Sequence, residues 1–325
     1  MNDLLSHQAL LDALTPWSGY VPPAHVANLF GVLTHVRFQP LSGIEPSAVG
    51  GGHVDVKLPQ LIDGGRSEWW FETVNWLGAA REARERFVMV SLGAQFGGQL
   101  VGAHHALQRT NPLPSLLVGV EPEPGNFAWM IEHFRANAID PAEHWLLPLA
   151  IAGMADPVLF PVGGPGTGAN NCVATNEAVA REQYVRELTV AGKAESALRS
   201  VLLDNTTGLR RALLPDGGYQ AEIKFVSAIT LSELLGPLAR VDYLEADIQQ
   251  SEILVSPPFL GLLRKKVHRI HIGTHGSDVH ATLHALFEQD GWRIIFSYPP
   301  NGRFETAIGA IQTNDGVLTV LNPDL

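Results

Sequence analysis

A series of short apolar runs, separated by segments with helical periodicity, is the feature that most constrains the fold of this chain. The runs are FVMVSL, SLLVGVE, HWLLPLAIAG, VDYLEADI, KVHRIHIG and GWRIIFSY. Short apolar runs bounded by turn residues are typical of strands buried on both faces, and their alternation with helices predicts a parallel sheet. We therefore expect a doubly wound α/β fold with helices on both faces of the sheet.

The segments around these runs suggest how the chain is divided. Residues 1–66 mix short apolar runs with Pro and Gly, and we expect an N-terminal cap with little regular structure. Residues 67–325 are expected to form one domain, beginning with an amphipathic helix for which Ser67 is the N-cap. A segment at about 163–225 is too long for an ordinary connection and is predicted to be an inserted, lid-like element. The helix after HIGTHG is expected to be capped by Ser277 or Asp278.

Charge and composition exclude some classes of protein. The 325 residues carry a formal net charge of −11, and an acidic chain without a basic run is a poor candidate for binding nucleic acid. The single cysteine, Cys172, permits no disulfide within the chain, as in a reducing compartment. The N-terminus lacks the pattern of a signal peptide, and the uncharged stretch 87–108 holds too many Gly and polar residues for a membrane span. We predict a cytoplasmic protein.

The first apolar run leads into a glycine-rich turn and a helical segment, FVMVSLGAQFGGQLVGAHHAL. In doubly wound folds such a turn lies at the carboxyl edge of the sheet, where ligands bind. A dinucleotide fingerprint needs glycine where this chain has Gln95, which disfavours NAD or FAD, and the ending of a nucleotide P-loop is absent. S-adenosylmethionine has no phosphate and demands less of that position.

The second run ends at Glu121, whose carboxylate can accept hydrogen bonds from both hydroxyls of a ribose. Together with the glycine-rich turn, this residue favours S-adenosylmethionine as the ligand. The alternative is that the glycines only turn the chain and that Glu121 is a solvated strand end.

Six motifs follow one another along most of residues 68–300: SEWWFETVNWLGA, RFVMVSLGAQFGGQL, VGVEPEPGNFAWMIEHFRAN, LAIAG, VDYLEADIQQSEIL and RIHIGTHG. In this order they resemble the FkbM family of S-adenosylmethionine-dependent methyltransferases. The resemblance implies a seven-stranded, Rossmann-like methyltransferase sheet that binds S-adenosylmethionine and releases S-adenosylhomocysteine. The cofactor-binding residues that it implies are Gly93, Ala94, Gln95, Gly97, Glu121, Pro122, Ala150 and Ile151.

The same resemblance implies O-methyl transfer to a hydroxyl, most simply that of a sugar in a polysaccharide, a glycolipid or a natural product. Positioning of donor and acceptor supplies much of the rate, and a base that removes the hydroxyl proton adds to it. We expect His275 to be the general base, with Asp247 orienting it or the acceptor. The alternatives are that Asp247 caps the following helix and that His275 only forms hydrogen bonds with the backbone of its turn. His280 and His284 have a metal-binding spacing but no accompanying carboxylate motif, so no metal site is predicted.

Departures from the family pattern leave a second account open. The family pattern has an acidic residue at the positions of Ser91, Gln249 and Gly273, and a glycine at those of Gln95 and Gln250. The alternative function is therefore a catalytically impaired, methyltransferase-like binding or scaffold protein.

Other features of the sequence allow more than one interpretation. Trp69 and Trp70 are either core residues or line the acceptor site, and Asn170 and Asn171 lie in a loop that an acceptor could reach. We expect a small molecule or glycan as acceptor. The sequence does not fix the acceptor, the methylated atom, the use of a divalent metal ion, or whether the chain forms a homo-oligomer.

Overall fold

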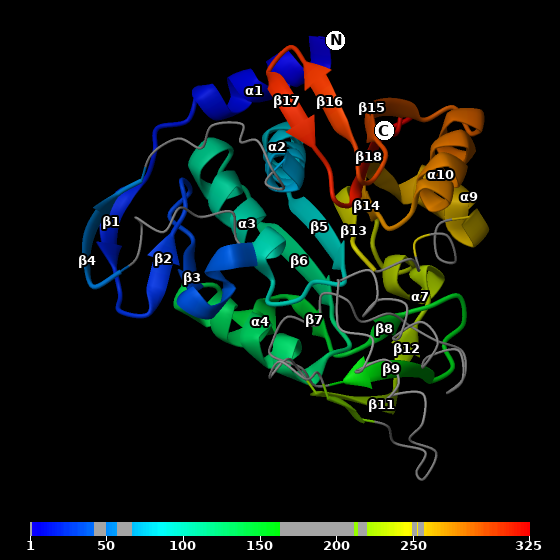
Figure 1. Cartoon of the computed structure of the whole chain (residues 1–325), viewed down its shortest axis with the longest axis horizontal. Coiled ribbons are helices and arrows are strands. Elements are labelled where there is room, and N and C mark those ends of the chain that lie inside the picture. Colours follow the sequence, from blue (N-terminus) through cyan, green and yellow to red (C-terminus); the bar gives the residue numbers. More distant parts are fainter. Residues whose placement is uncertain are drawn as a thin grey trace.

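The central element is a seven-stranded sheet in the order β15-β18-β14-β13-β5-β6-β7 (Figure 1). The computed structural model describes residues 2–41, 50–56, 67–162, 211–213, 220–248, 252 and 257–325. The strands are β5 (Phe87–Leu92), β6 (Ser115–Val120), β7 (Trp145–Leu147), β13 (Val241–Ala246), β14 (Val267–Thr274), β15 (Arg293–Tyr298) and β18 (Gly316–Leu321). Only β18 runs antiparallel to its neighbours in this sheet. The predicted mostly parallel, seven-stranded α/β fold is confirmed.

The chain builds this sheet outward from its middle. After β5 it adds β6 and β7 on one side, and later β13 and β14 on the other. The direction of winding therefore reverses between β5 and β13. In open α/β sheets, ligands bind in the crevice outside the carboxyl ends of the strands at such a switch point.

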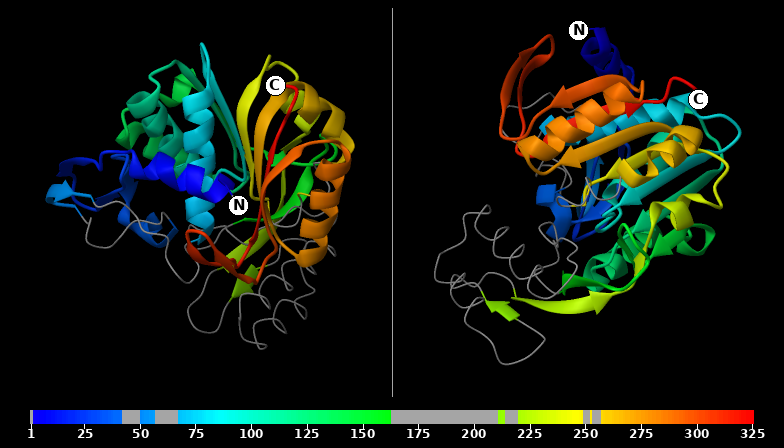
Figure 2. Two further views of the ribbon diagram at one scale, coloured as in Figure 1. Left: turned by 90° about the horizontal axis from the view of Figure 1, so that it is seen from above. Right: turned by 90° about the vertical axis from the view of Figure 1, so that its right-hand side faces the viewer.

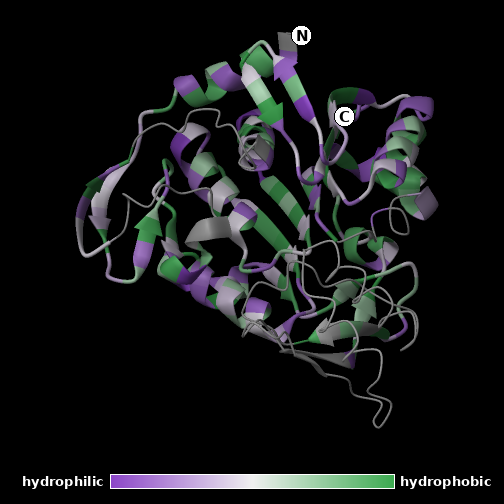
Figure 3. Ribbon diagram, viewed as in Figure 1, coloured by the Kyte–Doolittle hydropathy of each residue, from purple (hydrophilic) through white to green (hydrophobic). Residues whose placement is uncertain are grey.

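Helices cover both faces of the sheet (Figure 2). On one face lie α2 (Ser67–Glu82), α3 (Gly98–Thr110) and α4 (Pro124–Ala136), and on the other α7 (Leu231–Leu235), α9 (Leu260–Lys266) and α10 (Ser277–Gln289). Side chains of a strand alternate between the faces, so Met89 packs against the first group and Val90 against the second. The central strands β5 and β6 are mainly hydrophobic (Figure 3), whereas β13 and β14 also carry buried polar residues such as Glu245 and Arg269.

The N-terminal region contains more regular structure than the sequence predicts. It consists of α1 (Asn2–Asp12), β1 (Ser18–Val21), β2 (His25–Ala27), β3 (Leu33–His35), η1 (Val36–Leu41) and β4 (Gly52–Asp55). Two small antiparallel sheets form, β1 with β4 and β2 with β3. Leu4 and Leu11 of α1 join the main core, and Gln8 accepts a hydrogen bond from Trp70 Nε1 at 2.9 Å. These contacts attach the region to α2.

Three local predictions are wrong. Ser67 is the first helical residue of α2 and not its N-cap. The run HWLLPLAIAG is not one strand but two, because Pro148 has no N–H for the ladder, and β8 (Ala150–Ile151) pairs instead with β12 (Ala228–Ile229). Neither Ser277 nor Asp278 caps α10. Its N-cap is Gly276, with φ 133° and no side-chain cap, a backbone conformation that favours glycine.

The predicted insertion begins and ends in a small antiparallel sheet, β10-β11-β9, formed by β9 (Val158–Val162), β10 (Arg211–Leu213) and β11 (Gln220–Val226). A further hairpin joins β16 (Arg303–Thr306) to β17 (Gly309–Gln312), and η3 (Pro141–Glu143) and η4 (Pro257–Phe259) are single 3-10 turns. Predictions for the rest of the insertion, including a loop with Asn170 and Asn171, fall outside the described residues, as do those for Cys172, Gln249 and Gln250.

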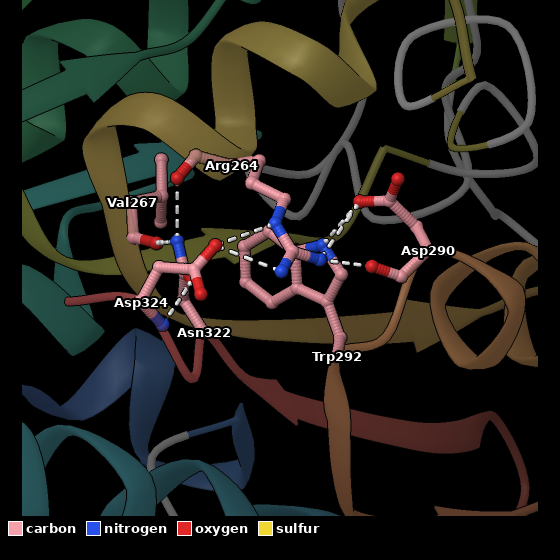
Figure 4. A network of polar contacts seen from close by, with 6 residues as sticks. All are labelled: Arg264, Val267, Asp290, Trp292, Asn322 and Asp324. Atoms are coloured by element: carbon pink, nitrogen blue, oxygen red, sulfur yellow. Dashed lines mark hydrogen bonds and ion pairs between the residues drawn. The ribbon is translucent and has the colours of Figure 1, made fainter.

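The C-terminal residues are held at the amino end of β14 by a polar network (Figure 4). Arg264 pairs with Asp324 at 2.8 Å and donates to the backbone carbonyl of Asp290. Asn322 Nδ2 donates to the carbonyl of Arg264 at 2.7 Å. This network lies at the edge of the sheet opposite to the carboxyl ends of its parallel strands. Among the described residues, no helix is both long and apolar enough to cross a membrane.

Candidate functional site

The glycine-rich turn connects the carboxyl end of β5 to α3 and is fastened to β6. The backbone N–H groups of Gly93 and Ala94 both donate to the carbonyl of Val120 at 3.0 Å. Gly93, Gln95 and Gly97 have φ values of 78°, 48° and 76°, in the left-handed region that glycine adopts without strain. The turn is therefore a defined loop at the switch point of the sheet.

Gly93 also permits a close approach between two strands. A Cβ atom at this position would lie 2.1 Å from the carbonyl oxygen of Asp247, and the N–H of Asp247 donates to the carbonyl of Leu92 at 3.1 Å. The carboxyl ends of β5 and β13 thus meet at Gly93. The sequence motif singled out this glycine, but only the structure shows that backbone contact requires it.

Glu121 is buried at the carboxyl end of β6, so it is not a solvated strand end. One of its carboxylate oxygens accepts the N–H of Gln95 at 2.8 Å, and the other accepts the N–H of Glu123 at 2.8 Å. Burial raises the pKa of Glu121 to about 7, although these N–H groups oppose the rise. Each oxygen of a carboxylate has two lone pairs, so Glu121 can still accept further hydrogen bonds from a ligand.

Asp247 and His275 are brought together, as the sequence predicts. Asp247 follows β13, His275 follows β14, and their side chains approach to 3.3 Å between Oδ1 and Nε2. The other ring nitrogen of His275, Nδ1, lies 3.0 Å from Oε1 of Glu252, which is fully buried, and Asp315 Oδ2 lies 3.7 Å from Nε2. His275 is thus surrounded by three carboxylates.

These carboxylates determine the protonation of His275. Burial alone would lower its pKa, but the hydrogen bond to Glu252 and the negative charges of Asp247, Glu252 and Asp315 raise the pKa to about 10. In this arrangement the imidazole is protonated at neutral pH. A protonated imidazole cannot accept a proton, so a role as general base needs positive charge beside the carboxylates to lower this pKa.

More carboxyl groups lie near Asp247. Burial raises the pKa of Glu245 to about 8, helped by the charge of Asp247, and burial raises that of Glu68 to about 7, helped by Asp315. The pKa of Glu72 is raised well above its usual range by burial and by the charges of Glu245, Asp247 and Glu68. Clusters of carboxyl groups with raised pKa values are typical of functional sites, and this one favours a cationic ligand.

The departure at Ser91 has a structural counterpart. Ser91 of β5 lies beside Glu245 of β13 in the sheet, and its hydroxyl donates to Glu245 Oε2 at 2.5 Å. The carboxyl group of Glu245 therefore lies beside Ser91 at the centre of the sheet. Similarly, a Cβ atom at Gly273 would lie 3.7 Å from the side chain of Asp247, so Asp247 occupies the space beside that position.

The aromatic cluster of α2 is core. Trp70, Phe71 and Trp76 are buried, and the indole N–H of Trp76 donates to Gln99 Oε1 at 2.9 Å. Trp69 is half-buried and packs against the same core. The core interpretation of these residues is confirmed.

His280 and His284 both contact a serine rather than a carboxylate. Their ring nitrogens lie 3.0 and 2.8 Å from the hydroxyl oxygen of Ser297. Burial, with the charge of His284, lowers the pKa of His280 to about 4. In the described part of the chain this pair belongs to no cluster with metal-binding geometry, whereas Asp247, Glu252 and His275 do form one.

The remaining predicted cofactor residues follow the strands β6 and β7 in the chain. Pro122 follows Glu121 and is half-buried, and Ala150 and Ile151 form the buried strand β8. Their contact with a cofactor stays a prediction.

Sequence reasoning missed several residues of the site. Glu252 belongs to the motif VDYLEADIQQSEIL, which carries part of the family resemblance, and this was the available signal. Glu68 and Glu72 belong to the motif SEWWFETVNWLGA, which carries part of the family resemblance. Nothing in the sequence marks Asp315, because it approaches His275 only through the antiparallel strand β18.

Comparisons with known proteins give no family assignment. No family model matches the chain, and no curated protein matches its sequence. Solved structures with a similar course include a precorrin-6y C5,15-methyltransferase from Geobacter metallireducens, at 8% identity and a TM-score of 0.38, covering 77% of this chain and 87% of that one. A putative RNA methyltransferase from Pyrococcus horikoshii has 9% identity and a TM-score of 0.36, covering 78% and 85%.

A third structure, a putative class I S-adenosylmethionine-dependent methyltransferase from Listeria monocytogenes, has 9% identity and a TM-score of 0.37, covering 80% of this chain and 60% of that one. TM-scores this low carry no argument about activity. The fold class, an α/β sheet of seven mostly parallel strands, follows from the strand order itself.

Proposed function

We propose that this protein is an S-adenosylmethionine-dependent O-methyltransferase of the FkbM type. One observation carries the proposal: a buried carboxylate, Glu121, lies beside a glycine-rich turn at the switch point of the sheet. Fixed carboxylate oxygens at this place suit the two hydroxyls of a ribose. The acidic groups around Asp247 suit the ammonium and sulfonium charges of the same ligand.

In this proposal some residues of the chain bind the donor and the acceptor, and another accepts the proton of the acceptor hydroxyl. S-adenosylmethionine supplies an electrophilic methyl group when bound. Glu121 binds the ribose, and the turn at Gly93 and Ala94 leaves room for the methionyl part. Asp247 lies beside both this turn and His275, so it holds the acceptor near the donor, and positioning of this kind supplies a large share of the rate.

His275 is the group that we propose to take the acceptor proton. Asp247, Glu252 and Asp315 keep it protonated in the ligand-free site. A positive charge next to Asp247 offsets the negative charge of these carboxylates and so lowers the pKa of His275. The acceptor is proposed to be a sugar hydroxyl, a class that rests on the family resemblance.

A calorimetric titration with S-adenosylhomocysteine tests the proposal. Wild-type protein should bind it, and Glu121→Gln should bind at least about tenfold more weakly, since hydrogen bonds to a charged group are worth about 1.5–3 kcal/mol. Glu132→Gln is the matched control, because Glu132 is exposed on α4 and pairs only with Arg135 in the described structure. Absence of both heat and thermal shift at millimolar ligand would contradict the proposal.

A catalytically impaired binding protein is the second candidate, and the protonated state of His275 favours it. This account predicts that the cofactor binds but that no S-adenosylhomocysteine is formed with a panel of polyhydroxylated acceptors. Transfer to one of them would exclude it.

A further inference from the structure

We propose that Asp247, Glu252 and His275 form a binding site for one divalent metal ion of the Mn²⁺ class. The three residues come from separate parts of the chain, after β13, before η4 and after β14. One donor atom from each lies within 4.8 Å of the others. A span of this size allows three ligands to close around one ion after small side-chain rotations.

The strongest sign of a missing ligand is the second carboxylate oxygen of Glu252. Glu252 is completely buried, and its Oε1 accepts the N–H of Ile248 at 3.1 Å and faces His275 Nδ1 at 3.0 Å. Its Oε2 is also buried and has no hydrogen-bond partner among the described residues. A buried carboxylate oxygen without a partner is costly, and a coordinated cation removes this cost.

The donor set indicates the class of metal. Two carboxylates favour hard cations that prefer oxygen ligands, and one imidazole is compatible with a transition metal. Mn²⁺ satisfies both conditions. Asp315, whose carboxylate lies 3.7 Å from His275 Nε2 and is half-exposed, adds negative charge at the rim.

The position of the site gives the ion a function, which rests on the proposed methyl transfer. Asp247 touches the glycine turn through its backbone and His275 through its side chain. A cation held there would lie at the carboxyl edge of the sheet, between the donor turn and the acceptor. It would bind the acceptor oxygen directly and lower the pKa of its hydroxyl. Because a coordinated imidazole cannot also accept a proton, the bound ion takes over this activating role from His275, and the released proton passes to water. We therefore expect acceptors with two adjacent oxygens that can chelate.

Mn²⁺ binding to the metal-free full-length chain tests the proposal. Free Mn²⁺ is measured by electron paramagnetic resonance during a titration, and one bound ion per chain is expected. Asp247→Asn, Glu252→Gln and His275→Gln should each weaken binding at least about tenfold, the loss typical of altering metal-site residues. His268→Gln is the matched control, because His268 lies on the same strand at its other end and also faces a carboxylate, Glu82, at 3.5 Å.

The outcomes separate this proposal from the proposed function. Far-UV circular dichroism and urea denaturation of the same samples report whether each variant keeps its fold, and binding of S-adenosylhomocysteine is measured on them separately, without metal. If the buried Glu252→Gln does not fold, Asp247→Asn, with a side chain 31% exposed, decides the question. Mn²⁺ binding that is absent, or unchanged in the folded variants, overturns the metal site even if S-adenosylhomocysteine binds. Mn²⁺ binding without S-adenosylhomocysteine binding supports the metal site and contradicts the methyltransferase.

Discussion

Replacement of Gly93 by Ala tests whether the contact between β5 and β13 shapes the site. Gly93 has φ 78°, and an added Cβ would lie 2.1 Å from the carbonyl oxygen of Asp247. Ordinary van der Waals contact begins at 3.4 Å, so the end of β13 would have to move by about 3.4 − 2.1 = 1.3 Å. Such a shift displaces Asp247 relative to the turn.

The expected loss in the free energy of unfolding has two parts that can be measured separately. The left-handed backbone costs a residue with a Cβ about 1–2 kcal/mol, and forcing an atom into a packed site costs about 1–3 kcal/mol. We therefore expect Gly93→Ala to lower the free energy of unfolding by about 2–5 kcal/mol, with additional loss of cofactor affinity.

Two control variants isolate these parts in urea denaturation experiments. Gly51 has φ 103°, but no atom of the described residues lies within 4 Å of the place that an added Cβ would take, so Gly51→Ala should show only the backbone cost. Gly261 lies in α9 with ordinary φ, and none of the described residues comes within 4 Å of an added Cβ, so Gly261→Ala should be neutral or stabilising by up to about 1 kcal/mol. The reasoning is refuted if Gly93→Ala is no more destabilising than Gly51→Ala.

Three further variants test the electrostatics and capping of the fold by urea denaturation. The pKa of Glu245 rises from 4.5 to about 8 on folding, so its contribution falls as the pH rises through this window. Glu245→Gln should reduce that decline, and an unchanged pH profile would contradict the burial effect. Although burial opposes it, His268 and Arg269 lower the pKa of Glu82 from 4.5 to about 2. Its stabilisation is therefore present above pH 4.5 and lost as the pH falls towards 2, and Glu82→Gln should remove this loss. Thr230 forms a capping box with Glu233 at the start of α7, and Thr230→Ala should cost about 1 kcal/mol. A cost equal to that of an exposed substitution elsewhere would show that the cap contributes nothing.

The positions of most main strands along the sequence could be predicted because each strand is a local apolar run. β5, β6, β13, β14 and β15 coincide with runs visible in the sequence. The segment GVLTVL is equally apolar but was not among those runs, and it forms β18 between β14 and β15. Its place depends on pairing with strands distant in sequence, which periodicity does not report.

The site could be predicted only where its residues belong to a local motif. Glu121 follows a strand and a glycine turn lies beside that strand, so both were found from the sequence. The three carboxylates around His275 converge from different segments, and their effect on its pKa follows only from that convergence. Burial of Glu121 depends likewise on the turn that closes over it.

A crystal structure of the protein with S-adenosylhomocysteine would test the central claim most directly. The account predicts that both ribose hydroxyls lie within hydrogen-bonding distance of the Glu121 carboxylate and that the homocysteine part lies against Gly93 and Ala94. Ligand bound elsewhere, or a Glu121 carboxylate that contacts only groups of the protein at saturating ligand, would contradict it.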